Sequence, residues 1–149
     1  MEILSWREVD LPGVILAGLV AGYVMALAGL WAGNIPGLVA IDIADLGRRY
    51  MVSDSPVAWV VGVASHLTNS VLLVFLWASV VEPNLFWPRP VEGLAWGLLL
   101  AAIFAGGLVA PVSGLGFMGL KTGSPRFAAT NILLHALWGT VAGMIYVPR

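Results

Sequence analysis

Hydrophobic residues in this chain are gathered into four long segments that contain no charged side chain. These uncharged segments are residues 11–41, 55–81, 93–120 and 127–148. An α-helix needs about 20 consecutive apolar residues to cross the hydrocarbon core of a membrane. Each segment reaches that length, so the pattern predicts four transmembrane helices, placed at about 13–32, 57–81, 93–117 and 127–147.

The connection between the first two predicted helices has a different pattern. Over residues 37–49, apolar side chains interleave with Asp42, Asp45, Arg48 and Arg49. This spacing is typical of a short amphipathic helix lying on a membrane surface, although an ordered loop that caps the bundle would fit it as well. The predicted fold class is therefore an all-α, polytopic integral membrane protein. It forms one domain over residues 1–149, with two helical hairpins and an interfacial helix between the first two spans.

Small residues recur at every fourth position in the first and third predicted helices. The two stripes are Gly18, Gly22 and Ala26, and Gly97, Ala101 and Ala105. Residues four apart share one helix face, and small side chains on that face let another helix approach closely. We expect the stripes to mediate self-association or contact with other membrane subunits, in addition to the contact that the protein makes with the lipid bilayer.

The composition narrows the function classes. Charged residues make up 10% of the 149, against about 25% in ordinary soluble domains. The net charge of −1 comes without a basic tract, which gives nucleic-acid binding no electrostatic support. The chain contains no cysteine, and this excludes disulfides, thiolate metal sites and iron–sulfur clusters.

The two histidines of the chain both fall inside predicted membrane helices. An ionisable side chain is costly there and usually faces the bundle interior or a cavity, so His66 and His135 are candidate functional residues. They lie at similar depths in two helices that run in the same direction, which lets them face one another. Asn69 and Asn131 lie close by in sequence, and either amide could accept the proton of a ring nitrogen and fix the tautomer.

One hypothesis is a b-type haem with His66 and His135 as its two axial ligands. A four-helix bundle is a common host for a cofactor, and two imidazoles suit an electron-transfer haem because no position remains for oxygen. Trp138 could pack on the macrocycle. Cations at the nearer membrane surface would meet the haem propionates, and the candidates are Arg48, Arg49, Lys121 and Arg126. Such a subunit would pass electrons in or beside a respiratory chain.

Two other interpretations stay open. The histidines could be neutral and hydrogen-bonded within a cofactor-free structural or accessory subunit of a larger membrane complex. The protein could also be a small transporter or proton path, although no carboxylate lies in a predicted span and such proteins commonly use one. No nucleophile–base pair stands out, so catalysis is not expected.

The whole chain resembles the YagU-like family of small bacterial four-helix membrane proteins. The most specific matching features are the run from Gly116 to Lys121 and the paired histidines, with Leu133, His135 and Gly139 forming the fourth-helix motif. Ser70 stands where the family pattern has glycine. The resemblance implies a four-helix fold, and it implies no particular activity. We expect a multi-pass location in the inner (cytoplasmic) membrane.

Overall fold

The computed structural model describes residues 1–45, 53 and 55–148, and these form helices and loops without strands. Four helices are long and apolar enough to cross a membrane: Leu11–Asn34, Pro56–Asn84, Arg89–Val112 and Arg126–Ile145. The prediction of four such helices is therefore confirmed. Together they suggest a multi-pass membrane protein.

Each long helix combines a regular α-helical part with shorter irregular turns. The first consists of α1 (Leu11–Trp31) and η1 (Ala32–Asn34), and the second of α3 (Pro56–Leu76), η2 (Trp77–Val81) and η3 (Glu82–Asn84). The third consists of α4 (Arg89–Leu100), η4 (Ala101–Val109) and α5 (Ala110–Val112). After the short turn η5 (Phe117–Thr122), the last helix is α6 (Arg126–Ile145).

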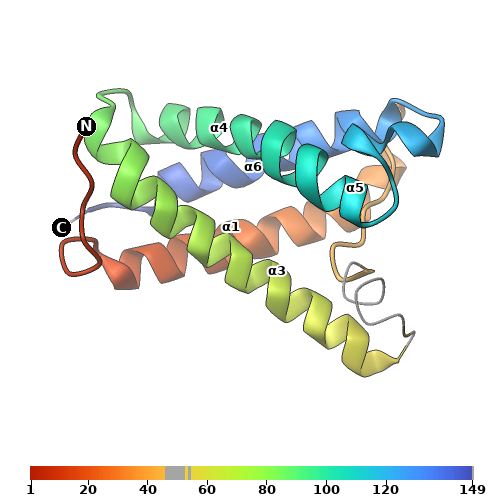
Figure 1. The fold of residues 1–149 in the computed structure, drawn as a ribbon, viewed down its shortest axis with the longest axis horizontal. Coiled ribbons are helices and arrows are strands. Elements are labelled where there is room, and N and C mark those ends of the chain that lie inside the picture. Colours follow the sequence, from red (N-terminus) through yellow and green to blue (C-terminus); the bar gives the residue numbers. More distant parts are fainter. Residues whose placement is uncertain (46–52, 54, 149) are drawn as a thin grey trace.

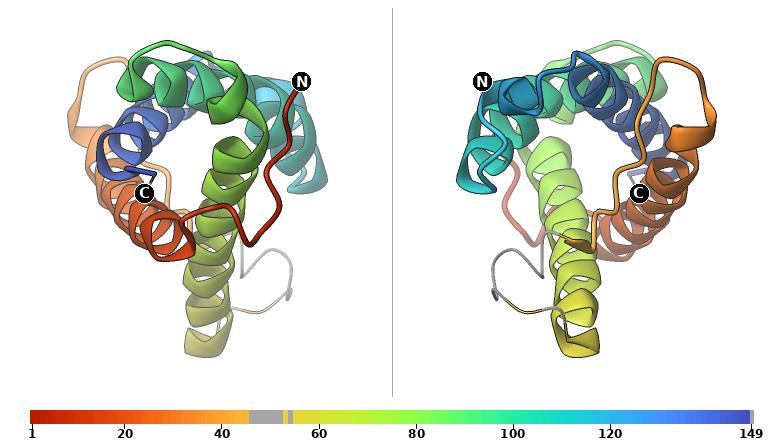
Figure 2. Two further views of the ribbon diagram at one scale, coloured as in Figure 1. Left: turned by 90° about the vertical axis from the view of Figure 1, so that its left-hand side faces the viewer. Right: turned by 90° about the vertical axis from the view of Figure 1, so that its right-hand side faces the viewer.

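The helices pack as two hairpins, α1 with α3 and α4 with α6, and α1 also packs against α6. In Figure 1, α4 and α6 run alongside each other, whereas α3 crosses the bundle obliquely. Figure 2 shows from two further sides that the N-terminal end of α3 projects away from the other helices. The first half of α3 is therefore poorly covered by neighbouring helices, and space is left between it and the α4–α6 hairpin.

Glycines bring α4 and α6 into direct backbone contact. A Cβ atom added at Gly93 would overlap the carbonyl of Gly139, and one added at Gly97 would overlap the carbonyl of His135. The reverse also holds, because a Cβ at Gly139 would overlap the carbonyl of Gly93. Helix association in a membrane depends on such close packing, since lipid tails are as apolar as the helices.

The small-residue stripes predicted from the sequence lie inside the bundle. A Cβ at Gly18 would come within 2.6 Å of Val71 Cα, and one at Gly22 within 2.9 Å of Ser70 Cβ, both on α3. Gly97 meets α6 in the same way. These glycines already form the helix contacts within each hairpin. A partner helix or a second copy of the protein would therefore have to bind another face.

The second half of the third helix is wound as a π-helix over Ala101–Val109. The backbone N–H of Ala110 donates to the carbonyl of Ala105, five residues earlier. The side-chain amide of Asn131 donates to the carbonyl of Ala101 at 3.0 Å, where the π-helical segment begins. This bond anchors the irregular segment to α6, and the segment forms one wall of the cavity described below.

The predicted interfacial helix is wrong over residues 37–44, which form turns and irregular backbone. Asp45 is helical, and residues 46–49 of the predicted helix lie outside the described residues. The backbone N–H of Val39 donates to Thr130 Oγ1 at 3.0 Å, and that of Ile41 donates to the carbonyl of Gly29 at 3.0 Å. These donors are satisfied by α6 and α1, so the segment is held against the bundle as a capping loop.

The third long helix begins earlier than predicted, and this places a carboxylate inside it. Glu92 lies in the first turn of α4 and is only 1% exposed. Its Oε1 atom accepts a hydrogen bond from the backbone N–H of Trp87 at 3.0 Å. The helix therefore includes a carboxylate that the predicted bounds, 93–117, left in the preceding connection.

Candidate functional site

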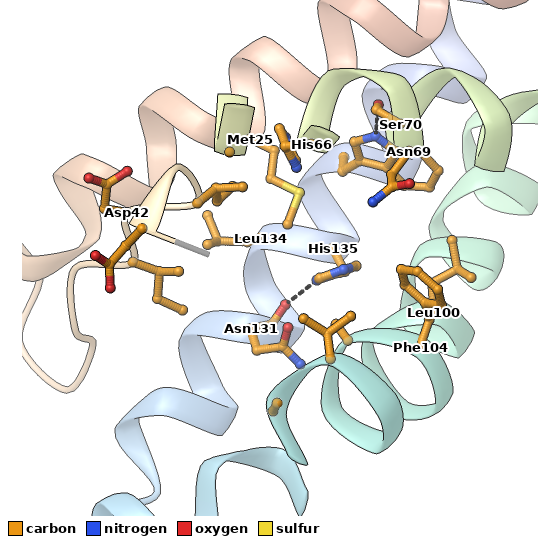
Figure 3. A pocket seen from close by; sticks show the side chains of 18 of the residues that line it. Met25, Asp42, His66, Asn69, Ser70, Leu100, Phe104, Asn131, Leu134 and His135 are labelled. Atoms are coloured by element: carbon orange, nitrogen blue, oxygen red, sulfur yellow. Dashed lines mark hydrogen bonds between the residues drawn. The ribbon is translucent and has the colours of Figure 1, made fainter. Parts of the chain in front are cut away.

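A cavity of about 320 Å³ lies between the two hairpins, next to the splayed half of α3. Its walls come from α3, α6 and the third long helix, with Met25 from α1 and with residues 40–43 and 45 from the loop after the first helix. Figure 3 shows the cavity from close by. The cavity contains both histidines of the chain, together with Asn69, Asn131 and Trp138. The structure thus brings five of the predicted site residues to one place.

The imidazole of His66 is held by α1. Its Nε2 atom lies 2.9 Å from the carbonyl oxygen of Gly22. A carbonyl oxygen only accepts, so Nε2 must carry the proton. In a neutral ring, Nδ1 is then the nitrogen with a free lone pair. Gly22 makes this contact accessible, because it has no side chain between its helix and α3.

The imidazole of His135 is held by its own helix. Its Nδ1 atom lies 2.9 Å from the backbone carbonyl oxygen of Asn131, one turn earlier, as the dashed line in Figure 3 shows. Nδ1 therefore donates, and Nε2 is the nitrogen with a free lone pair in the neutral ring. The sequence suggested that an asparagine amide would fix the tautomer. At Asn131 this is wrong, because its amide donates to Ala101 and its backbone carbonyl takes the imidazole proton.

Trp138 closes the inner end of the cavity through a chain of hydrogen bonds. Its Nε1–H donates to Ser70 Oγ at 2.6 Å, and the Ser70 hydroxyl donates to the carbonyl of Gly18 at 2.6 Å. The three residues belong to α6, α3 and α1. The side chains of Trp138 and Ser70 are both buried. Their hydrogen bonds therefore fix the distance between the two hairpins at this point of contact.

The cavity has a polar end and an apolar end. Asp42 and Asp45 line one end, and Figure 3 shows Asp42 on the opposite side of His135 from Leu100 and Phe104. Leu73 and Trp138 add to the apolar lining of the cavity. A wall graded in this way suits a molecule with a polar head and an apolar body.

The side of the cavity is open near the middle of the second long helix. Ser65 and Asn69 line the wall, and both are exposed. Asn69 lies close to the midpoint of the apolar helix Pro56–Asn84. If that helix crosses a membrane, the opening faces lipid tails and not water. A polar side chain at such a depth is costly unless it faces a cavity or another polar group.

Of the four predicted cationic residues, the two that the structure describes are not brought to the cavity. Lys121 and Arg126 are both exposed and form no part of the cavity wall. Arg48 and Arg49 lie outside the described residues. The charged groups that do line the cavity within the described part of the chain are the carboxylates of Asp42 and Asp45.

These residues fit a haem poorly. His135 presents Nε2 to the cavity, as an axial ligand would, but His66 already uses its Nε2 atom on the carbonyl of Gly22. Haem propionates placed at the polar end would meet Asp42 and Asp45.

Several cavity residues were missed by sequence reasoning. Asp42 and Asp45 were placed on a surface helix, and Ser65 and Phe104 were not singled out. A signal for Ser65 was present, because Ser65 and Asn69 are polar residues four apart in an apolar helix and so share one face. Phe104 carried no such signal, since one apolar residue among many does not reveal which face lines a cavity.

Comparison with family models, curated proteins and solved structures finds no match. The resemblance to YagU-like proteins therefore stays a prediction. The functional interpretation depends on the geometry of the cavity alone.

Proposed function

We propose that this protein is a multi-pass membrane protein that binds a lipophilic small molecule in the cavity between its two helical hairpins. The ligand enters sideways from the bilayer, and the protein acts as a binding or carrier subunit without catalysing a reaction. The observation that carries the proposal is the cavity itself, which combines an apolar wall with two imidazoles and opens at Ser65 and Asn69 near the middle of an apolar helix.

Size and lining both support ligand binding. Pockets for small molecules usually have volumes of roughly 300–1,000 Å³ and are mostly apolar, with a few polar groups that orient the ligand. The cavity of about 320 Å³ lies at the lower end of that range. His66 from one hairpin and His135 from the other are among the polar groups that line it.

The proposal favours a lipophilic ligand over the alternatives considered from the sequence. A cofactor-free accessory subunit would have no use for a largely apolar cavity that opens on one side and contains two imidazoles. Haem b is the less favoured occupant because of the hydrogen bond on His66 Nε2 and the carboxylates at the polar end. Transport remains compatible with the proposal, since a carrier must also bind its substrate.

Photolabelling tests the proposal. The protein in zwitterionic liposomes is irradiated with a long-chain alcohol that carries a diazirine, and labelled peptides are mapped by mass spectrometry. We expect saturable labelling at Phe104 and Leu134, which line the cavity. The lipid-facing residues Ile103 and Leu108, 64% and 54% exposed, should be labelled without saturation.

A matched pair of alanines supplies the control. Ala105 lines the cavity, whereas Ala102 is exposed on the same π-helical segment and is not part of the wall. Ala105→Trp should fill the cavity and abolish the saturable labelling, and Ala102→Trp should leave it unchanged. Labelling confined to Ile103 and Leu108, or equal in both variants, would contradict the proposal.

A further inference from the structure

We infer that the cavity selects uncharged lipophilic hydroxyl compounds, such as long-chain alcohols, over analogues that can only accept hydrogen bonds. The inference rests on the proposed function and adds the chemical class of the ligand. Its basis is the distribution of hydrogen bonds along the buried part of the cavity wall. There the donors are used within the protein, whereas acceptors are left open to the cavity.

Trp138, Ser70 and Asn131 are buried wall residues whose donors are already used. Trp138 Nε1–H donates to Ser70 Oγ at 2.6 Å, and the Ser70 hydroxyl donates to a backbone carbonyl of α1 at 2.6 Å. The side-chain amide of Asn131 donates to the carbonyl of Ala101 at 3.0 Å and contacts Met118 Sδ at 3.9 Å. A ligand therefore cannot use these donors without breaking contacts between helices.

Both imidazoles, in contrast, offer an acceptor. His66 donates through Nε2 to Gly22, and His135 donates through Nδ1 to Asn131, so the other nitrogen of each neutral ring keeps its lone pair. Neither of these two nitrogens is sealed inside the described part of the protein. Because both histidines line the cavity, their free lone pairs are reached from it.

The side-chain oxygen of Asn131 adds a third acceptor. A carbonyl oxygen only accepts, so the bond to Ala101 requires the amide nitrogen of Asn131 to face that residue. Its Oδ1 atom then points the other way, and Figure 3 shows it on the side of His135. Asn131 and His135 are four residues apart and share one face of α6, so their acceptors lie on the same wall of the cavity.

Of the two imidazoles, His135 is better placed to hold the hydroxyl head. Its free nitrogen, Nε2, lies at the outer edge of the ring, whereas the free Nδ1 of His66 is next to Cγ and so closer to its own helix. The bond from Nδ1 to Asn131 holds the His135 ring in one orientation. Figure 3 shows Leu100 and Phe104 to one side of His135, so a head at Nε2 leaves apolar wall for the alkyl chain.

This wall discriminates by what a bound molecule leaves unpaired. A ligand that fills the cavity excludes water, so an acceptor that it does not satisfy stays unpaired in apolar surroundings. A hydroxyl group donates to such an acceptor, whereas an ether oxygen brings only lone pairs of its own. Ser65 and Asn69 at the opening can each donate or accept, so they favour neither class.

Competition against the photoactivatable alcohol tests the chemical class. Dodecanol is compared with undecyl methyl ether, which has the same number of heavy atoms, in zwitterionic nanodiscs, with each concentration corrected for partition into the bilayer. We expect dodecanol to displace the label from Leu134 at about tenfold lower concentration than the ether. Equal competition by the two compounds in the wild-type protein would overturn the inference.

Two phenylalanine variants on α6 locate the acceptor. His135→Phe keeps a flat ring without Nε2, and it should bring dodecanol to the concentration that the ether needs while leaving competition by the ether unchanged. Leu137 is exposed and is not part of the cavity wall, so Leu137→Phe should keep the preference for the alcohol. An undiminished preference in His135→Phe would overturn the inference and leave the proposed function in place. Absence of saturable labelling by the alcohol itself would instead reject the proposed function.

Discussion

Replacing Gly139 by alanine is expected to destabilise the bundle by about 3 kcal/mol, the upper end of the usual cost of overpacking. The added Cβ atom would overlap the carbonyl of Gly93 on α4. That atom belongs to a helix backbone and cannot rotate away, so α4 and α6 must move apart along their contact. The direction of the change in stability is informative, because a glycine-to-alanine change in an unobstructed helix stabilises the helix by up to about 1 kcal/mol.

Unfolding in mixed micelles with increasing denaturing detergent, followed by circular dichroism, measures this effect. Ala95→Val on α4 is the matched control, because Ala95 is exposed and lies two residues from Gly93 and Gly97. We expect this variant to unfold at the same amount of denaturing detergent as the wild type. A Gly139→Ala protein as stable as the wild type would mean that α4 and α6 are not in backbone contact at this position.

Truncating Trp138 to alanine is expected to cost about 3 kcal/mol, the lower end of the range for a buried tryptophan in a soluble core. The lower end applies because lipid, and not water, surrounds apolar groups when membrane helices separate. Trp138 is 3% exposed and donates to Ser70, which in turn donates to Gly18. The substitution therefore removes both the packing and the link between the hairpins.

Trp138→Phe separates the two contributions. It keeps most of the ring and leaves the Ser70 hydroxyl bonded to Gly18, so only about 0.5–1.5 kcal/mol should be lost. Combining Trp138→Phe with Ser70→Ala in a double-mutant cycle isolates the hydrogen bond between the two side chains. Strict additivity of the two single changes would show that Trp138 and Ser70 are not coupled and that the hairpins are joined elsewhere.

Much of the fold could be predicted from the spacing of charges along the chain. The four helices appear where the uncharged segments lie, because the length of an apolar run alone decides whether it can cross a membrane. The residues at which the helices begin and end were harder to predict. Glu92 was assigned to a connection because it is charged, but the helix begins at Arg89 and Glu92 turns back to satisfy the backbone N–H of Trp87.

The loop that caps the cavity could not be predicted from the same pattern. The interleaved apolar and charged residues at 37–49 fit a surface helix and a capping loop equally well, and over residues 37–44 the choice is made by tertiary partners. Thr130 and Gly29 accept the backbone N–H groups of Val39 and Ile41. Local sequence contains no information about these partners, which are far away in the chain.

The paired histidines were the part of the site that sequence reasoning located. Their rarity and their similar depth in parallel helices were enough to place them together, and both line one cavity. Their tautomers were not predictable, because these depend on which backbone carbonyls lie within reach. The carbonyl of Gly22 on another helix and that of Asn131 on the same helix determine which ring nitrogen carries the proton. In the neutral rings, the other nitrogen of each histidine is then a hydrogen-bond acceptor.

Protection of a single cysteine at the opening of the cavity tests most directly whether a ligand enters from the bilayer. The chain contains no cysteine, so Asn69→Cys and Ala64→Cys each carry one reactive site. Both positions are exposed on α3, but only Asn69 lines the cavity. In liposomes, we expect a photoactivated lipid-soluble diazirine, which inserts into the S–H bond and needs no thiolate, to label both cysteines, and dodecanol to slow labelling at Asn69→Cys but not at Ala64→Cys. Equal rates at the two positions with and without dodecanol would contradict a ligand-binding cavity that opens toward the membrane.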